Sequence, residues 1–150
     1  MEMELAYDHL GSRLRRIGEV ELTYGRWGSR PRSIGSWALT YDYLGSRLRS
    51  IAGHAVEYER WSGRCRSAGT WELEYERLGT RLRRIGPYEL VHDQLGTRLR
   101  SVGPLVLRYD LLGSRPAGVE LPDGSAALSD DDLMALFLAL HLREVANEGG

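Results

Sequence analysis

The sequence predicts a mainly β protein: an antiparallel barrel of about 14 strands, closed or nearly closed, around one hydrophobic C-terminal helix. Three observations predict it. A similar segment recurs every 17 residues in seven copies, apolar and polar residues alternate within each copy, and the chain ends in an apolar run with helix-start signals. We expect a single domain over residues 1–150, with hairpin repeats over 3–121, a linker over 122–128 and a buried helix over 129–147.

The repeat keeps its period without a slip. Numbered from Met3, its ninth position falls every 17 residues, at Gly11, Gly28, Gly45, Ser62, Gly79, Gly96 and Gly113. Fixed self-similarity of this kind is typical of repeat architectures. A unit of 17 residues is too short for the two helices of most helical repeats, but it accommodates two short strands and two turns.

Each copy predicts one β-hairpin. In the fifth copy, "WELEYE" (Trp71–Glu76) alternates apolar and acidic residues, which indicates a strand with one buried face. Leu or Trp, then Gly, then Ser or Thr form the expected turn. A second strand runs from the Arg at position 11 to the Ile or Val at position 15. Position 16, usually Gly, turns the chain into the next copy.

The side on which the arginines lie is left open by the pattern. Two-residue turns throughout would put position 13 on opposite faces, so one turn has an odd length or the strand has a bulge. The 13 arginines of positions 11 and 13 then lie either outside, beside the acids, or inside, among Tyr and Trp. We favour the outside, because burying unpaired guanidinium groups is very costly. That orientation places Ile51 and its equivalents outside as well.

The C-terminal segment predicts a buried helix. Ser129 is a suitable N-cap, Asp130 to Asp132 suit the positive start of a helix, and Leu128 can pack on Leu133. The apolar residues go almost all the way round, yet the run is too short to span a bilayer. Fourteen strands would enclose a radius of about 14 Å, enough for inward side chains and a helix about 10–12 Å wide.

The closure of the sheet is also left open. An incomplete half-barrel around the helix would bury most of the same apolar surface. Pro116 and Gly118 weaken the last predicted strand, so we expect any opening there.

Composition narrows the functional classes. The net charge of −1 disfavours a nucleic-acid binder, although all 20 basic residues are Arg. Cys65, the single cysteine, excludes an intrachain disulfide or a cysteine-built metal site, and we expect it to be a small buried hydrophobe. No basic segment followed by an apolar one begins the chain, so we expect a cytoplasmic protein without a signal peptide or membrane span.

Two resemblances bear on the architecture. The segments "YDHLGSRLR" and "YDYLGSRLR" resemble the YD repeats of bacterial Rhs proteins, whose core is Tyr-Asp, two residues and Gly-Arg-Leu. Here a Ser or Thr separates the Gly from the Arg, and the period is shorter. The resemblance implies a β-hairpin wall built around other chain, in a bacterial protein, and does not carry over a toxin activity. The expected sheet around a hydrophobic helix is also similar in architecture to the tubby and scramblase barrels.

No catalytic constellation stands out. An active site needs one asymmetric group of residues, whereas the carboxylates recur in every copy, and His9, His54, His92 and His141 lack ligand-like spacing. We therefore expect no enzyme, no cofactor and no metal, but a non-enzymatic repeat protein with a structural or protein-interaction role.

The alternative is a lectin-like or anion-binding module that uses the repeated charged and aromatic columns. Its partner would be an anionic or saccharide ligand, whereas the first hypothesis allows a protein partner and identifies none. The candidate ligand-binding residues are Arg47, Arg49, Arg81, Arg83, Arg98 and Arg100.

Overall fold

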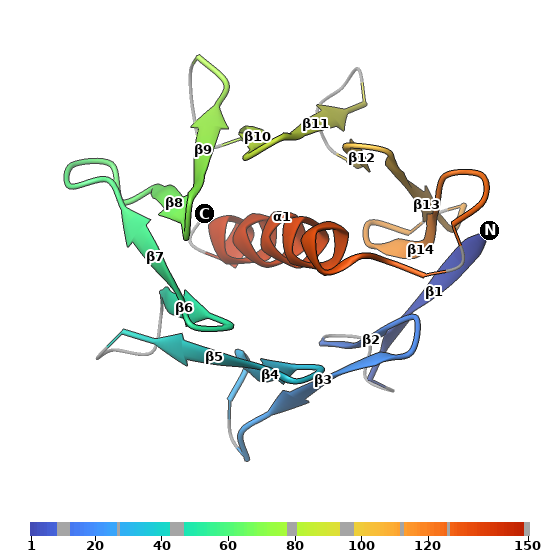
Figure 1. Cartoon of the computed structure of the whole chain (residues 1–150), viewed down its shortest axis with the longest axis horizontal. Helices are drawn as coiled ribbons and strands as arrows, with labels where there is room; N and C mark the ends of the chain where they lie inside the picture. Colours follow the sequence, from blue (N-terminus) through green and yellow to red (C-terminus); the bar gives the residue numbers. More distant parts are fainter. Residues whose placement is uncertain are drawn as a thin grey trace.

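A computed structural model describes residues 1–8, 13–26, 28–42, 47–77, 81–93, 98–111, 113–125 and 127–148, with the side chains of the last helix as far as residue 144. The described chain forms a closed antiparallel barrel of 14 strands around one helix (Figure 1). The fold predicted from the repeat and the terminal apolar run is therefore confirmed. The half-barrel alternative is excluded.

Each repeat supplies two strands, and the first is the longer in all but the seventh repeat, where both have five residues. The first strands are β1 (Glu2–Tyr7), β3 (Val20–Tyr24), β5 (Trp37–Tyr41), β7 (His54–Tyr58), β9 (Trp71–Tyr75), β11 (Tyr88–His92) and β13 (Leu105–Tyr109). Their partners are β2 (Leu14–Ile17), β4 (Pro31–Ile34), β6 (Leu48–Ile51), β8 (Cys65–Ala68), β10 (Leu82–Ile85), β12 (Leu99–Val102) and β14 (Pro116–Glu120). The partner strands begin at position 12, one residue later than expected.

A bulge in each hairpin decides which side chains face inward. Tyr41 pairs with Leu48 and Thr40 with Ser50, which leaves Arg49 as the extra residue. Leu48 and Ile51 therefore both face the core, and the two residues between them both lie on the outer side. The arginines of position 13 are exposed as expected. The expectation that Ile51 lies outside is wrong, since it is fully buried.

The ends of the sheet join through β1 and β14. Glu2, Met3 and Glu4 pair with Glu120, Val119 and Gly118. An added Cβ at Gly118 would lie 2.9 Å from the Glu2 Oε1 atom, so the Glu2 carboxylate occupies the space beside this glycine. The opening expected beside Pro116 and Gly118 is therefore wrong, because β14 pairs with β1 as well as with β13.

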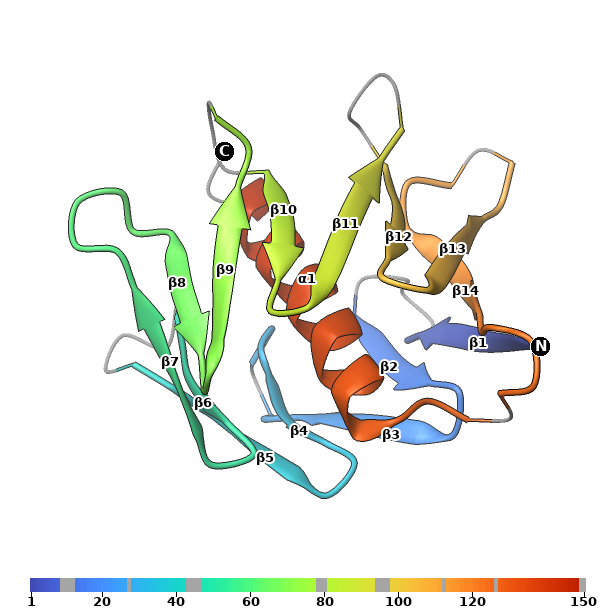
Figure 2. The same ribbon diagram turned by 45° about the horizontal axis from the view of Figure 1, so that its top comes forward.

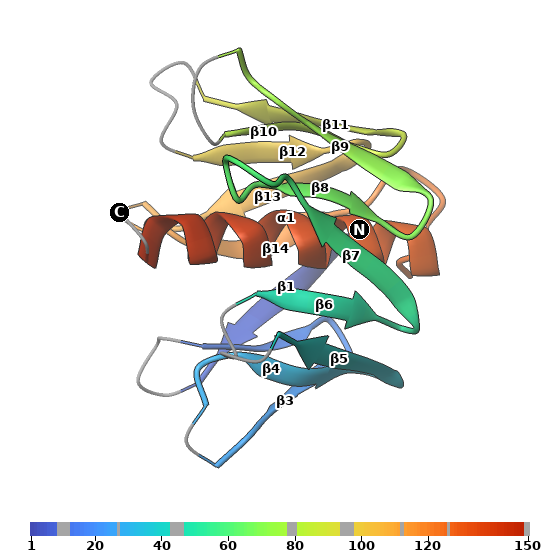
Figure 3. The same cartoon turned by 90° about the vertical axis from the view of Figure 1, so that its left-hand side faces the viewer.

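The helix α1 (Asp130–Glu148) runs through the barrel with strands on all sides (Figures 2 and 3). Ser129 caps it as expected, since its Oγ accepts a hydrogen bond from the Asp132 amide at 3.1 Å. The run from Ala135 to Ala139 is at most 2% exposed and contacts the inward strand residues in one core. In the part of the chain that the structure describes, no helix has the length and apolar character needed to cross a lipid bilayer.

Candidate functional site

One rim of the barrel carries a repeated unit of three side chains. Tyr58 donates a hydrogen bond to the Leu48 carbonyl of the preceding repeat at 2.8 Å. The Arg47 guanidinium lies over the Tyr58 ring, 4.7 Å from its centroid, and pairs with Asp42 at 3.3 Å. Tyr24, Tyr75 and Tyr109 are held by an Arg and a carbonyl in the same way. Where it occurs, the unit joins one hairpin to the next.

The same contact bridges the two ends of the sheet. Tyr7 donates to the Pro116 carbonyl at 2.7 Å, and Arg115 lies 4.2 Å from the Tyr7 ring centroid. Burial is the main reason that the pKa of Tyr7 is raised to about 12, so its hydroxyl stays a donor at neutral pH. The ring of contacts departs from this pattern in the sixth repeat, where His92 occupies the tyrosine position.

The candidate ligand-binding residues fall into two groups. Arg47 and Arg98 belong to the rim and each lies over a tyrosine ring, while Arg81 pairs with Glu76. Arg83 pairs with Glu74 at 2.5 Å on the outer wall. Arg49 and Arg100 are exposed on β6 and β12. The six arginines are spread over three repeats and do not form one pocket among the described residues.

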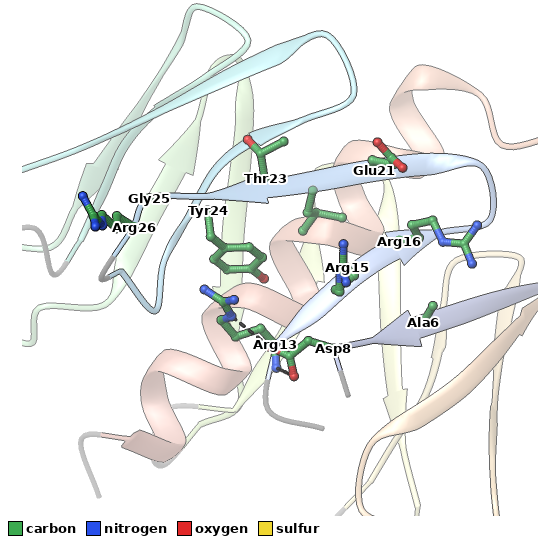
Figure 4. A pocket seen from close by; sticks show the side chains of 11 residues that line it. Ala6, Asp8, Arg13, Arg15, Arg16, Glu21, Thr23, Tyr24, Gly25 and Arg26 are labelled. Atoms are coloured by element: carbon green, nitrogen blue, oxygen red, sulfur yellow. Dashed lines mark hydrogen bonds and ion pairs between the residues drawn. The ribbon is translucent and has the colours of Figure 1, made fainter. Parts of the chain in front are cut away.

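A groove elsewhere on the barrel gathers more positive charge. It has a volume of about 710 Å³ and lies over β1, β2 and β3 (Figure 4). Its described lining includes four arginines, Arg13, Arg15, Arg16 and Arg26, and two acids, Asp8 and Glu21. Because the whole chain carries a net charge of −1, this local excess of guanidinium groups stands out.

The bulge explains why two of these arginines lie together. Arg15 and Arg16 are the two residues between the buried Leu14 and Ile17, so both point outward from β2. Figure 4 shows both on the β2 strand, between Arg13 and the end of the hairpin that carries Glu21. Arg15 and Arg16 form no ion pair or hydrogen bond within the part of the chain that the structure describes. Their guanidinium groups are thus available to a ligand.

The fifth repeat contains the equivalent pair of arginines, but carboxylates neutralise their charge. Its arginines Arg83 and Arg84 occupy the same two positions, and Glu74 lies 2.5 Å from Arg83 and 3.8 Å from Arg84. Arg84 also pairs with Glu89 at 3.0 Å. In the first repeat the residue equivalent to Glu74 is Ala6, the backbone partner of Arg16. A single alanine therefore accounts for the missing carboxylate.

The rim end of the groove is one of the repeated tyrosine–arginine–acid units. Arg13 donates from Nε to Asp8 Oδ2 at 3.0 Å and from a terminal nitrogen to the Gly28 carbonyl at 3.1 Å. Its guanidinium lies 4.4 Å from the Tyr24 ring centroid. Burial, followed by the Glu144 charge, raises the pKa of Tyr24 to about 12. These contacts hold the Arg13 side chain in place at this end of the groove.

The buried polar groups of the described chain include no activated nucleophile and no metal-binding cluster. Cys65 is buried as expected, which raises the pKa of its thiol to about 12 and makes it a poor nucleophile. His141 stacks on Phe137 inside the barrel. Among the described residues, no group of three or more His, Cys, Asp or Glu side chains is placed to hold a metal ion.

The groove was not predicted from the sequence, although differences between the copies indicate it. The Arg columns are nearly uniform along the chain, so the useful comparison is between copies, at the positions opposite the arginines. Ala6 stands where the fifth copy has Glu74, and Gly25 stands where other copies have Asp or Glu. Comparison of the chain with protein-family models, curated proteins and solved structures finds no match, and therefore gives no support to the YD-repeat or tubby-like resemblances.

Proposed function

We propose that the protein is a non-enzymatic binding module in which the barrel is a rigid scaffold and the β1–β3 groove holds an anionic group of a partner. The observation that carries this proposal is the Arg15–Arg16 pair, exposed in a groove of about 710 Å³ and lacking the glutamate that its counterpart in the fifth repeat has. Planar guanidinium groups suit carboxylate and phosphate oxygens, which they bind through two parallel hydrogen bonds.

The repeated wall favours a scaffold over an enzyme. Several of its other charged side chains pair with one another, as Arg66 does with Glu57 at 3.1 Å and Arg108 with Glu2 at 2.8 Å. Such exposed pairs add little stability. A partner that presents a phosphate or a cluster of carboxylates would find four arginines together in the β1–β3 groove.

The test is calorimetric titration with pyrophosphate and with citrate at low salt. We expect binding that weakens as salt is added, because exposed charges are screened. Ala6→Glu restores the glutamate of the fifth repeat and should weaken binding at least about tenfold, the loss expected for one charge-assisted hydrogen bond. Arg16→Gln should act in the same direction.

The fifth repeat supplies the matched control. Arg84→Gln removes the equivalent arginine from the neutralised arrangement and should leave anion binding unchanged, while thermal melting confirms that each variant is folded. Equal losses from Arg16→Gln and Arg84→Gln would mean that the anions respond only to overall charge. The anion-binding role would then be rejected.

A further inference from the structure

A second cavity lies where the repeat pattern breaks, at the end of the barrel that receives the start of α1. It has a volume of about 620 Å³. Three consecutive turns border it, each followed by the first residue of a long strand: Trp37 on β5, His54 on β7 and Trp71 on β9. Asp130, Asp131 and Met134 of the helix complete the wall.

A small residue at one inward position adds to the space. Ala68 lies in the lining at position 15, which is Ile or Val in the six other copies. His54 occupies position 1 between the two tryptophans, and it is exposed. A smaller residue at a site built for Ile leaves room that a neighbouring side chain would otherwise fill. The cavity is therefore specific to the third to fifth repeats.

The two tryptophans are held differently. Trp71 packs on Gly86, where an added Cβ would come within 2.5 Å of the indole, and its ring lies 5.5 Å from that of Tyr88. In the third repeat the residue equivalent to Gly86 is Ala52, which has a φ of 52° and is the only non-glycine residue with positive φ in the described chain. A strained alanine at this place is consistent with a local functional demand.

The charge of the cavity selects the kind of ligand. Its described lining contains two carboxylates, Asp130 and Asp131, and no arginine, in a chain with 20 arginines. Indole faces attract cations through their negative π surface, and nearby carboxylates add to this attraction. A neutral sugar would also stack on the indoles, but it would make no use of the two negative charges.

We propose that this cavity binds a small organic cation, such as a methylated ammonium group, against the Trp37 and Trp71 indoles that line it, with the helix-start carboxylates in the same lining. The cavity and its aromatic walls carry the proposal, and the carboxylates determine the sign of the ligand charge. The site is separate from the β1–β3 groove, so either one can fail without the other.

The experiment titrates choline into the isotope-labelled full chain while the four tryptophan indole N–H resonances are followed by NMR. We expect the resonances of Trp37 and Trp71 to shift and that of Trp61 to stay. The uncharged isostere 3,3-dimethylbutan-1-ol should bind at least about fivefold more weakly, as expected for the loss of a cation–π contact. Methyl glucoside is titrated in parallel.

Two pairs of variants make the test specific. Trp37→Leu and Asp131→Asn should each weaken choline binding at least about threefold, within the range of one cation–π or charge contact. Trp61→Leu, which alters a tryptophan that is 92% exposed on a hairpin loop at the opposite rim, and Asp123→Asn should leave it unchanged. Equal binding of the uncharged isostere, tighter binding of the glucoside, or no shift at millimolar choline would each overturn the proposal.

Discussion

At the scale of single residues, one side chain of the rim can be compared with its equivalents in the other repeats. His92 takes the position at which six other copies place a tyrosine, and burial is the main cause of its lowered pKa. The tyrosines donate to the carbonyl of position 12 in the preceding repeat, as Tyr75 does to Cys65 at 2.7 Å. The equivalent carbonyl for residue 92 is that of Leu82.

We expect His92→Tyr to stabilise the protein by about 1 kcal/mol, the usual net value of one hydrogen bond. Urea denaturation measures the change in the free energy of unfolding. His92→Phe adds a ring without the hydroxyl and separates packing from hydrogen bonding. A tyrosine variant that is no more stable than the phenylalanine variant would contradict the assigned role of the rim tyrosines.

His141 gives a second residue-level prediction, for pH dependence. Burial, followed by the charge of Arg30, lowers its pKa to about 4 from the ordinary value of 6.5. The unfolded chain therefore binds a proton between about pH 6.5 and pH 4 that the folded chain does not, and stability falls as the pH falls through this window.

Over that window, this histidine should remove roughly 3 kcal/mol of stability. Thermal melting between pH 7.5 and pH 4.5 measures the effect, and His141→Leu should flatten the slope because the apolar side chain does not titrate. The same slope in both proteins would show that other groups cause the acid sensitivity.

At the scale of elements, five of the six turns between repeats begin with a glycine, and the third begins with Ala52. Ala52 adopts a left-handed conformation that costs an L-residue about 1–2 kcal/mol, whereas Gly86 adopts it freely. We expect Ala52→Gly to raise the free energy of unfolding by about 1 kcal/mol. Gly86→Ala should lower it by more than that, because the added methyl group would also meet the Trp71 ring.

Thermal melting of the two variants provides the measurement, and each turn is the control for the other. A neutral Gly86→Ala would mean that Trp71 can move away from the turn without loss. That result would also weaken the description of Trp71 as a fixed cavity wall.

The elements also show what the sequence could and could not predict. Strand positions, the helix cap and the buried helix follow from alternation and spacing, because these are local properties of the chain. The bulge required knowledge of which residues pair, and it alone decides that Ile51 is buried while Arg49 is exposed. The groove escaped prediction for the same reason, since Ala6 matters only through its partner across the strand, Arg16.

At the scale of the whole molecule, the helix occupies the interior of the barrel and supplies much of its core. Leu136 and Leu138 are fully buried, Phe137 is 2% exposed, and all three belong to the core that includes the inward strand residues. Each such side chain contributes roughly 1.5–3 kcal/mol, while total stability is typically about 5–15 kcal/mol. We therefore expect that the sheet does not fold stably without these side chains.

Deletion of residues 129–150 should therefore give a chain that aggregates or oligomerises through its exposed apolar face. Phe137→Asp alone should severely destabilise the protein, because it buries an unpaired charge. Size-exclusion chromatography and thermal melting check both changes, with Asp123→Asn in an exposed turn as the control. A monomeric truncated chain with an unaltered melting temperature would contradict the core role of the helix.

The ring of seven hairpins and its single helix do not share a symmetry. A helix has 3.6 residues per turn, so it cannot offer the same surface to seven equivalent neighbours. If all copies were identical, the helix could rotate about its axis among several orientations of similar energy. The interior would then be packed, but the helix would have no single preferred orientation. The irregular inward residues, among them Cys65 and Ala68, break this degeneracy. The imperfections of the repeat are thus what gives the molecule one native arrangement.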